Sequence, residues 1–166
     1  AAMTEIAHFI DNARVAGTSG RSQPVFNPAT GEAEKTVALA SADEIDRAVA
    51  SAKAAWATWS RTPPLRRARI LDRFKMILWD RADRLAEAIS AEHGKTHDDA
   101  VGEVTRGLEV VEFAAGAPHL LKGEITENVG SAVDSHSLRL QLAVVAASTP
   151  FNFPAILPKR RFPVAH

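Results

Sequence analysis

The chain has 166 residues, of which 46% are hydrophobic and 24% charged, and its twenty basic and twenty acidic side chains cancel to a net charge of zero. This composition suits one soluble domain or part of a larger protein, and it provides no net field to attract nucleic acid or an anionic membrane. We therefore predict neither as a partner. The absence of cysteine excludes disulfides, thiolate metal sites and thiol nucleophiles within these residues.

Targeting and metal-binding signals are missing from the sequence. Residues 1–8 lack the basic start and apolar core of a signal peptide, and no apolar run approaches the roughly 18 residues of a spanning helix. The six His residues are scattered without metal-ligand spacing, and there is no Gly-x-Gly-x-x-Gly phosphate loop. We predict a soluble, cytoplasmic protein without a metal site.

Short strands and turns are predicted in the first forty residues. Asp11-Asn12 tolerates the left-handed backbone of a tight turn, which favours a hairpin over residues 8–15. A Gly/Ser-rich loop at residues 17–22 and turn signals at residues 27–31 indicate a second short strand around Val25, and residues 35–40 a third. The beginning of the chain is therefore expected to be β-structure.

Helices are predicted from residue 42 to residue 118. Ser41 and Glu44 form a capping box, which predicts a helix to about Ser60. An apolar stripe from Leu65 predicts one long helix that ends near Gly94. A third helix follows up to residue 118, and its two glycines, at positions 102 and 107, indicate that another segment approaches it closely.

Apolar and polar residues alternate from Gly123 to Leu140, interrupted by Gly130-Ser131, and this pattern predicts a two-stranded ribbon. A lone ribbon is marginally stable and leaves its edges unpaired. It is therefore either an oligomer contact or a hairpin folded back over the chain's own helices, and the sequence leaves both open.

The stretch after the ribbon carries the strongest sign of chemistry. The apolar residues 142–147 predict a buried strand, followed by the loop 148–154 and a new helix. Loops at the carboxyl ends of strands are where open α/β sheets present their sites. Asn152 lies between Pro150 and Pro154, and its amide offers two N–H donors to a developing oxyanion. The alternative is that Asn152 only turns the chain while its flanking Phe residues pack in the core.

Several short motifs occur in order along the chain, at residues 26–31, 94–96, 106–112, 118–124 and 149–154. Together, over about residues 8–158, they resemble the aldehyde dehydrogenase superfamily. The motif at 106–112, and Phe151 where Trp is commoner, resemble more narrowly the CoA-acylating methylmalonate-semialdehyde dehydrogenases.

The resemblance implies an α/β fold, the amino-terminal portion of the aldehyde dehydrogenase fold. Residues 1–122 would be the first part of the NAD-binding domain, residues 123–141 an oligomerisation hairpin, and residues 142–166 the first core strand and the start of the active-site helix. It also implies a homo-oligomer.

The implied reaction is the NAD-dependent oxidation of malonate or methylmalonate semialdehyde, in which a Cys thiolate attacks the aldehyde and the thioester is released to coenzyme A. Asn152 matches the amide that donates to the oxyanion, and Thr149 and Phe151 match positions beside the nicotinamide. Arg106 matches a position that holds the substrate carboxylate, for which a guanidinium is well shaped. From the residues alone, Arg106 is a surface arginine on a helix.

The chain departs from the family at several points. It corresponds to about the first third of a member, and the nucleophilic Cys, the general-base Glu and the phosphate-binding loop of the family lie beyond that part. Without a thiol the 166 residues are predicted to be inactive alone. Ala143 and Ala147 replace family glycines, and residues 159–161, Lys-Arg-Arg, replace an apolar core helix in which three unpaired cations would be too costly.

Two functions from different classes follow. The first is the amino-terminal part of an NAD-dependent aldehyde dehydrogenase. The second is a non-catalytic interaction module, or a truncated relic, that associates through the predicted ribbon.

Overall fold

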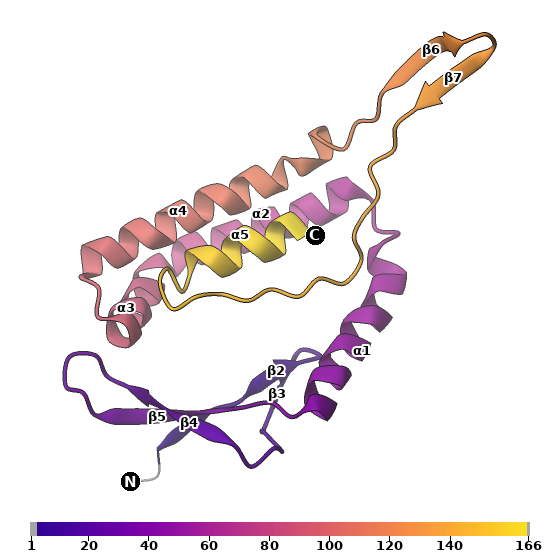
Figure 1. Cartoon of the computed structure of the whole chain (residues 1–166). Coiled ribbons are helices and arrows are strands. Elements are labelled where there is room, and N and C mark those ends of the chain that lie inside the picture. Colours follow the sequence, from indigo (N-terminus) through magenta and orange to yellow (C-terminus); the bar gives the residue numbers. More distant parts are fainter. Residues whose placement is uncertain (1–2, 166) are drawn as a thin grey trace.

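The computed structural model describes residues 3–165, with strands first, then a group of helices, a projecting ribbon and a final helix (Figure 1). In the larger sheet, β5 (Ala33–Ala38) pairs in parallel with β1 (Thr4–Ile6) and antiparallel with β4 (Ser22–Phe26). A separate hairpin joins β2 (His8–Ile10) to β3 (Ala13–Val15). The predicted strands are therefore confirmed.

Polar side chains make the tight turns that the sequence predicts in this region. Asp11 and Asn12 both have positive φ, of 53° and 61°, at the turn of the β2–β3 hairpin. After β4, the side-chain oxygen of Asn27 accepts from the N–H of Ala29 at 2.8 Å, which is an Asx turn. Gly31 follows with a φ of 74°, a conformation that favours glycine.

Helix α1 (Ala42–Trp59) begins with the predicted capping box between Ser41 and Glu44. The buried Glu44 carboxylate also accepts from the backbone N–H of Thr18 at 2.8 Å. The backbone N–H of Ser41, followed by that of Thr18, lowers the pKa of Glu44 to about 2. One carboxylate therefore ties the start of α1 to the loop that precedes β4.

The single long helix predicted from Leu65 to Gly94 is wrong, because the chain bends at Arg81 between α2 (Pro64–Asp80) and α3 (Ala82–His93). Arg81 has a φ of −114° and a ψ of 15°, outside the helical range. The apolar stripe continues across the bend, which is why the sequence pattern conceals it. The predicted stop at Gly94 is confirmed by its φ of 80°.

The bend allows the two parts of the stripe to pack against different parts of α4 (His97–Ala115). Residues of α3 pack against α4 between Ala100 and Leu108 in one cluster, and Leu71 of α2 packs against the last turns of α4 in another. The buried members are Ala86, Ile89, Ala100, Val104 and Leu108 in the first, and Leu71, Val111 and Ala114 in the second. Helix α4 is therefore the centre of the helical layer, and a short 3-10 turn (Ala117–His119) follows it.

The predicted ribbon forms from β6 (Ile125–Gly130) and β7 (Val133–His136), which are exposed on both faces and project away from the helices (Figure 1). The alternative that it folds back over the helices is therefore wrong. Its turn is at Ser131 and Ala132, one residue later than predicted, and Ala132 has a φ of 59°.

The predicted buried strand at residues 142–147 is also wrong in this structure. These residues are irregular, and among residues 3–165 no strand pairs with them. A strand that is buried in a parallel sheet needs neighbours for its backbone groups. In addition, Ala143 has a φ of 72°, a left-handed conformation that a glycine adopts without strain.

The final helix, α5 (Ile156–Ala165), lies beside α2 and α4 (Figure 1). The ring of Phe162 meets that of Phe74 on α2 edge to face, with centroids 5.3 Å apart. Among the residues that the structure describes, no helix has the length and apolar character to cross a bilayer.

Candidate active site

The loop before α5 presents Asn152 to solvent. Phe153, the next residue, has a φ of 61°, a conformation that is costly for a bulky residue and persists only where its surroundings hold it. The backbone is therefore fixed in an uncommon turn directly beside the candidate oxyanion donor.

Both aromatic neighbours of Asn152 contact the region where α3 ends. The Phe151 ring stacks on that of His93, with centroids 4.5 Å apart and planes at 14°. The Lys95 ammonium lies 4.1 Å from the centroid of the Phe153 ring, which is cation–π distance. Since the Phe151 side chain is 73% exposed, the alternative in which both Phe residues pack in the core is wrong.

Glu103 of α4 holds the chain where the loop enters α5. Its Oε1 accepts from the backbone N–H of Ala155 at 2.7 Å and from that of Ile156 at 3.2 Å. Its Oε2 accepts from the Lys95 ammonium at 2.8 Å. Glu103 is 0% exposed, so a fully buried carboxylate links the loop, α5 and Lys95, which lies two residues after the end of α3.

The Glu103 carboxylate is held in its charged form. Burial raises its pKa, but the hydrogen bond from Lys95 and the N–H groups of Ala155 and Ile156 together outweigh burial and leave the pKa below its usual value. A carboxylate at the start of a helix is also favoured by the helix dipole. Glu103 is therefore a fixed anion at neutral pH.

Lys159 is the buried member of the predicted cationic cluster, and it is 5% exposed, whereas Arg160 and Arg161 are exposed. Its side chain lies against Gly107, where a Cβ atom would come 2.5 Å from the Lys159 Cδ; the predicted close approach at this glycine is confirmed. Burial lowers the pKa of Lys159, and Glu103 opposes that shift. Its ammonium has no hydrogen-bond partner within the described chain. One cation, not three, is therefore buried here.

The turn at residues 26–31 packs behind the same region. A Cβ atom on Gly94 would lie 3.2 Å from the Cγ of Pro28. Gly94 immediately precedes Lys95, which contacts the loop. Three of the motifs that are far apart in sequence, at residues 26–31, 94–96 and 149–154, therefore meet in space.

The remaining predicted site residues lie nearby but are less constrained. Thr149 is exposed at the start of the Asn152 loop. Arg106 is exposed on α4, one turn after Glu103, and its guanidinium lies 3.8 Å from where a Cβ on Gly102 would be. Thr149, Phe151 and Asn152 thus share one loop, and Arg106 stands on the helix that anchors it.

Sequence reasoning missed His93, Lys95 and Glu103. The signal for Glu103 was its position, three residues after Ala100 and four before Gly107, on the buried stripe of α4. A lone carboxylate on an apolar stripe requires partners. The ring contacts of His93 and Lys95 had no comparable signal, because they depend on the path of the distant loop.

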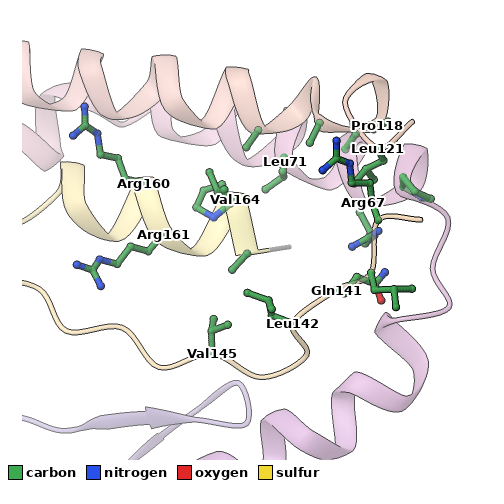
Figure 2. Close-up of a pocket in the computed structure, with 18 of the residues that line it drawn as sticks. Arg67, Leu71, Pro118, Leu121, Gln141, Leu142, Val145, Arg160, Arg161 and Val164 are labelled. Atoms are coloured by element: carbon green, nitrogen blue, oxygen red, sulfur yellow. The ribbon is translucent and has the colours of Figure 1, made fainter. Parts of the chain in front are cut away.

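A cavity of about 720 Å³ opens between α2, α5 and the irregular residues 139–147. Leu142 and Val145 face α5 across it, and Leu71 and Val164 line the opposite side, with arginines at its margin (Figure 2). The apolar residues of the predicted strand therefore line an open space. In the part of the chain that the structure covers, no group of three His, Asp or Glu side chains is arranged to hold a metal ion.

Residues 15–166 match the aldehyde dehydrogenase family. A malonate-semialdehyde dehydrogenase of Pseudomonas aeruginosa is 46% identical over 158 residues, which are 95% of this chain and 32% of that protein. The crystal structure of methylmalonate-semialdehyde dehydrogenase from Oceanimonas doudoroffii is 49% identical, with a TM-score of 0.93 over 98% of this chain and 33% of that one. A Sinorhizobium meliloti structure assigned to the same enzyme and complexed with NAD is 53% identical, with a TM-score of 0.91 over 95% of this chain and 32% of that one.

The chain therefore belongs to the aldehyde dehydrogenase family, and its fold is the amino-terminal part of the aldehyde dehydrogenase fold, as the motifs predicted. It spans about a third of the length of the relatives that it matches.

Proposed function

We propose that these residues are the amino-terminal part of an NAD-dependent dehydrogenase that oxidises malonate or methylmalonate semialdehyde and passes the acyl group to coenzyme A. The proposal is supported by the similarity to enzymes with these substrates in their names. Because the chain has no cysteine, it contains no thiolate for the covalent step, and we propose that it is inactive alone.

The observation that carries the proposal is the presentation of Asn152. Its side chain is exposed while the residues on both sides are held by His93 and Lys95. When a thiolate adds to an aldehyde, negative charge develops on the carbonyl oxygen, and a fixed amide donor stabilises that charge more than it stabilises the substrate. We assign this donation to Asn152.

NAD is implied by the family, and the loop offers groups that suit its nicotinamide end. The Phe151 ring has one face on His93, and the residue as a whole is 73% exposed, which leaves aromatic surface for a flat ring. The exposed Thr149 provides a hydroxyl. When bound, NAD supplies the hydride acceptor. We propose that Thr149 and Phe151 border it.

Arg106 is proposed to hold the carboxylate of the semialdehyde. Its exposed guanidinium can form two parallel hydrogen bonds with a carboxylate. The position one turn after Glu103 places it on the helix that anchors the Asn152 loop. Substrate and oxyanion donor would thus be held by the same rigid element.

The remaining surfaces suit a larger assembly. We propose that residues 142–147 form a strand in a family-length protein, where added sheet neighbours would cover Leu142 and Val145. We also propose that residues 123–141 form an oligomer contact, since both faces of the β6–β7 ribbon are exposed and an unpaired edge is suited to pairing with another chain. Residues 1–122 would then belong to the NAD-binding domain.

The test uses a family-length enzyme that carries these 166 residues, with NADH formation as the readout. Asn152→Ala and the isosteric Asn152→Asp should each lower kcat by about 10² to 10³, because both remove the amide donors. Arg106→Ala should raise KM for malonate semialdehyde more than for propanal. Turnover by the 166-residue chain alone, or equal effects of Arg106→Ala on both aldehydes, would contradict the respective assignment.

The second candidate function is an interaction module that uses the β6–β7 ribbon. The exposure of the whole ribbon favours it. Size-exclusion chromatography with light scattering tests the module in the isolated chain: a monomer counts against it, and a ribbon-dependent dimer or larger species agrees with both candidate functions. Ile125→Lys is a suitable variant, because a charge there should disrupt an apolar contact.

A further inference from the structure

We propose that Lys95 and Glu103 are positioning residues that hold the Asn152 amide where it meets the oxyanion. This inference rests on the proposed function, in which Asn152 is the donor. Neither side chain needs to contact the substrate, because both act through the backbone and rings on each side of Asn152.

Glu103 fixes the carboxyl end of the loop. Two successive backbone N–H groups, of Ala155 and Ile156, donate to one oxygen of a carboxylate that is 0% exposed. Charge-assisted hydrogen bonds in a buried site are short and strong. The chain three residues after Asn152 therefore has little freedom to move relative to α4.

Lys95 transmits this constraint to the residue next to Asn152. Its ammonium donates to the second Glu103 oxygen at 2.8 Å and lies 4.1 Å from the Phe153 ring centroid. The left-handed Phe153 backbone, with a φ of 61°, is the part of the loop that most needs support. One cation thus joins the buried carboxylate to the strained residue beside the donor.

The constraint has a functional consequence because an oxyanion donor works only within a narrow distance of its target. A displacement of about 1 Å caused by a change away from the reacting atoms can cost up to about 10² in rate. Loss of the Lys95 or Glu103 contact should therefore lower kcat while leaving the binding of aldehyde and NAD nearly unchanged.

The experiment uses the family-length enzyme that carries these residues. Lys95→Met retains the length of the side chain but removes the ammonium, and Glu103→Gln retains an acceptor for the two N–H groups but removes the charge that Lys95 needs. Each should lower kcat by about 10-fold to 100-fold, with KM for aldehyde and NAD within about twofold. Lys35→Met, which breaks the exposed pair with Glu92 at 3.3 Å, is the matched control and should leave kcat unchanged.

A double-mutant cycle separates positioning from general destabilisation. If Lys95 acts through Asn152, Lys95→Met should lower kcat much less in an Asn152→Ala background than in the wild type. Hydrogen exchange followed by mass spectrometry should also show faster exchange in peptides that cover residues 148–158 for Lys95→Met and Glu103→Gln, and no change for Lys35→Met. If Glu103→Gln fails to fold, the partly exposed Lys95 still provides the test.

Equal kcat losses from Lys95→Met in both backgrounds would overturn the positioning role, as would wild-type kcat in Lys95→Met. These outcomes leave the proposed function intact provided that Asn152→Ala retains its large loss. Wild-type kcat in Asn152→Ala would instead refute the donor role itself, and the positioning role with it.

Discussion

The loop at residues 148–155 and the segment at residues 137–147 adjoin in sequence and both lack regular structure, but they are held very differently. The loop is fixed by a ring contact, a cation and two backbone bonds to Glu103. In the preceding segment, Ser137 bonds to Glu124 at the base of the ribbon. Residues 138–147 have one long hydrogen bond to the rest of the described chain, of 3.5 Å, from Gln141 to the carbonyl of Ser60, and Leu142 is 88% exposed.

The difference shows what each segment needs in order to be ordered. Polar anchors from α3 and α4 are enough to fix a short loop, because each bond satisfies a specific backbone or side-chain group. An apolar strand gains its stability from neighbours on both sides and from cover on both faces. The helices of this chain supply polar anchors for the loop, whereas its described strands supply no neighbour for residues 142–147.

The largest effect should come from removing the anchor of the loop. Glu103→Ala leaves the Lys95 ammonium and two N–H groups without their acceptor in a buried site, and we expect a loss of about 3–5 kcal/mol in the free energy of unfolding. Urea denaturation followed by circular dichroism measures it. Glu127→Ala, on the exposed ribbon, is the control and should stay within about 0.5 kcal/mol. Similar losses of unfolding free energy in Glu103→Ala and Glu127→Ala would show that Glu103 contributes no more to stability than an exposed side chain.

Two leucines, one in the helical core and one in the irregular segment, compare the apolar packing of the two regions. Leu108→Ala opens a cavity in the cluster between α3 and α4 and should cost about 2–3 kcal/mol. Leu142→Ala removes the same atoms from a side chain that is 88% exposed, so it should change stability by less than about 0.5 kcal/mol. The same denaturation assay applies. A cost above 1 kcal/mol at Leu142 would mean that this segment is covered in solution.

Replacement of Lys159 should raise stability instead of lowering it, because burying its ammonium is costly within a well-packed region. Lys159→Met keeps the contact with Gly107 and removes a buried ammonium, so stability at pH 7 should rise by about 1 kcal/mol. Since burial lowers the pKa of Lys159, the unfolded state binds more protons just below pH 10.5, and wild-type stability should rise with pH there. Lys159→Met should flatten that rise, and Arg161→Met should not. A loss of stability in Lys159→Met would show that the buried Lys159 ammonium stabilises the folded chain.

Acid should have the smallest effect near neutral pH, where both buried carboxylates of this region remain charged. The pKa of Glu103 lies below its ordinary value of 4.5, and that of Glu44 is lowered to about 2. Each carboxylate therefore contributes stability that is complete above pH 4.5 and is lost as the pH falls through the folded pKa. Urea denaturation between pH 7 and pH 2.5 measures the decline, which Glu103→Gln should make shallower. If Glu103→Gln leaves the slope of stability against pH unchanged, Glu103 does not contribute to the decline in acid.

Features set by neighbouring residues were predicted well from the sequence. The capping box at Ser41, the left-handed turn at Asp11-Asn12 and the stop at Gly94 all depend on a few adjacent side chains. The bend at Arg81 was missed because the apolar stripe continues through it, and only the packing on α4 separates its two parts.

The candidate site was predicted in part for the same reason. The motif at residues 149–154 led to Asn152, Thr149 and Phe151 without any knowledge of what surrounds them, and their roles remain proposals. The side chains that hold the loop come from 52 and more residues earlier in the chain. These side chains meet the loop only because of how the chain folds, which no local sequence pattern reveals.

The bond between Glu103 and Ala155 spans 52 residues and encloses the whole β6–β7 ribbon. In polymer terms, the ribbon is an insertion between two fixed points. Doubling the length of such a loop adds only about 0.6 kcal/mol to the free-energy cost of closing it. The ribbon can therefore lengthen, shorten or change its surface in evolution at little cost to the loop at residues 148–155. The proposed assembly role of the ribbon and the proposed chemical role of the loop are thus free to diverge separately.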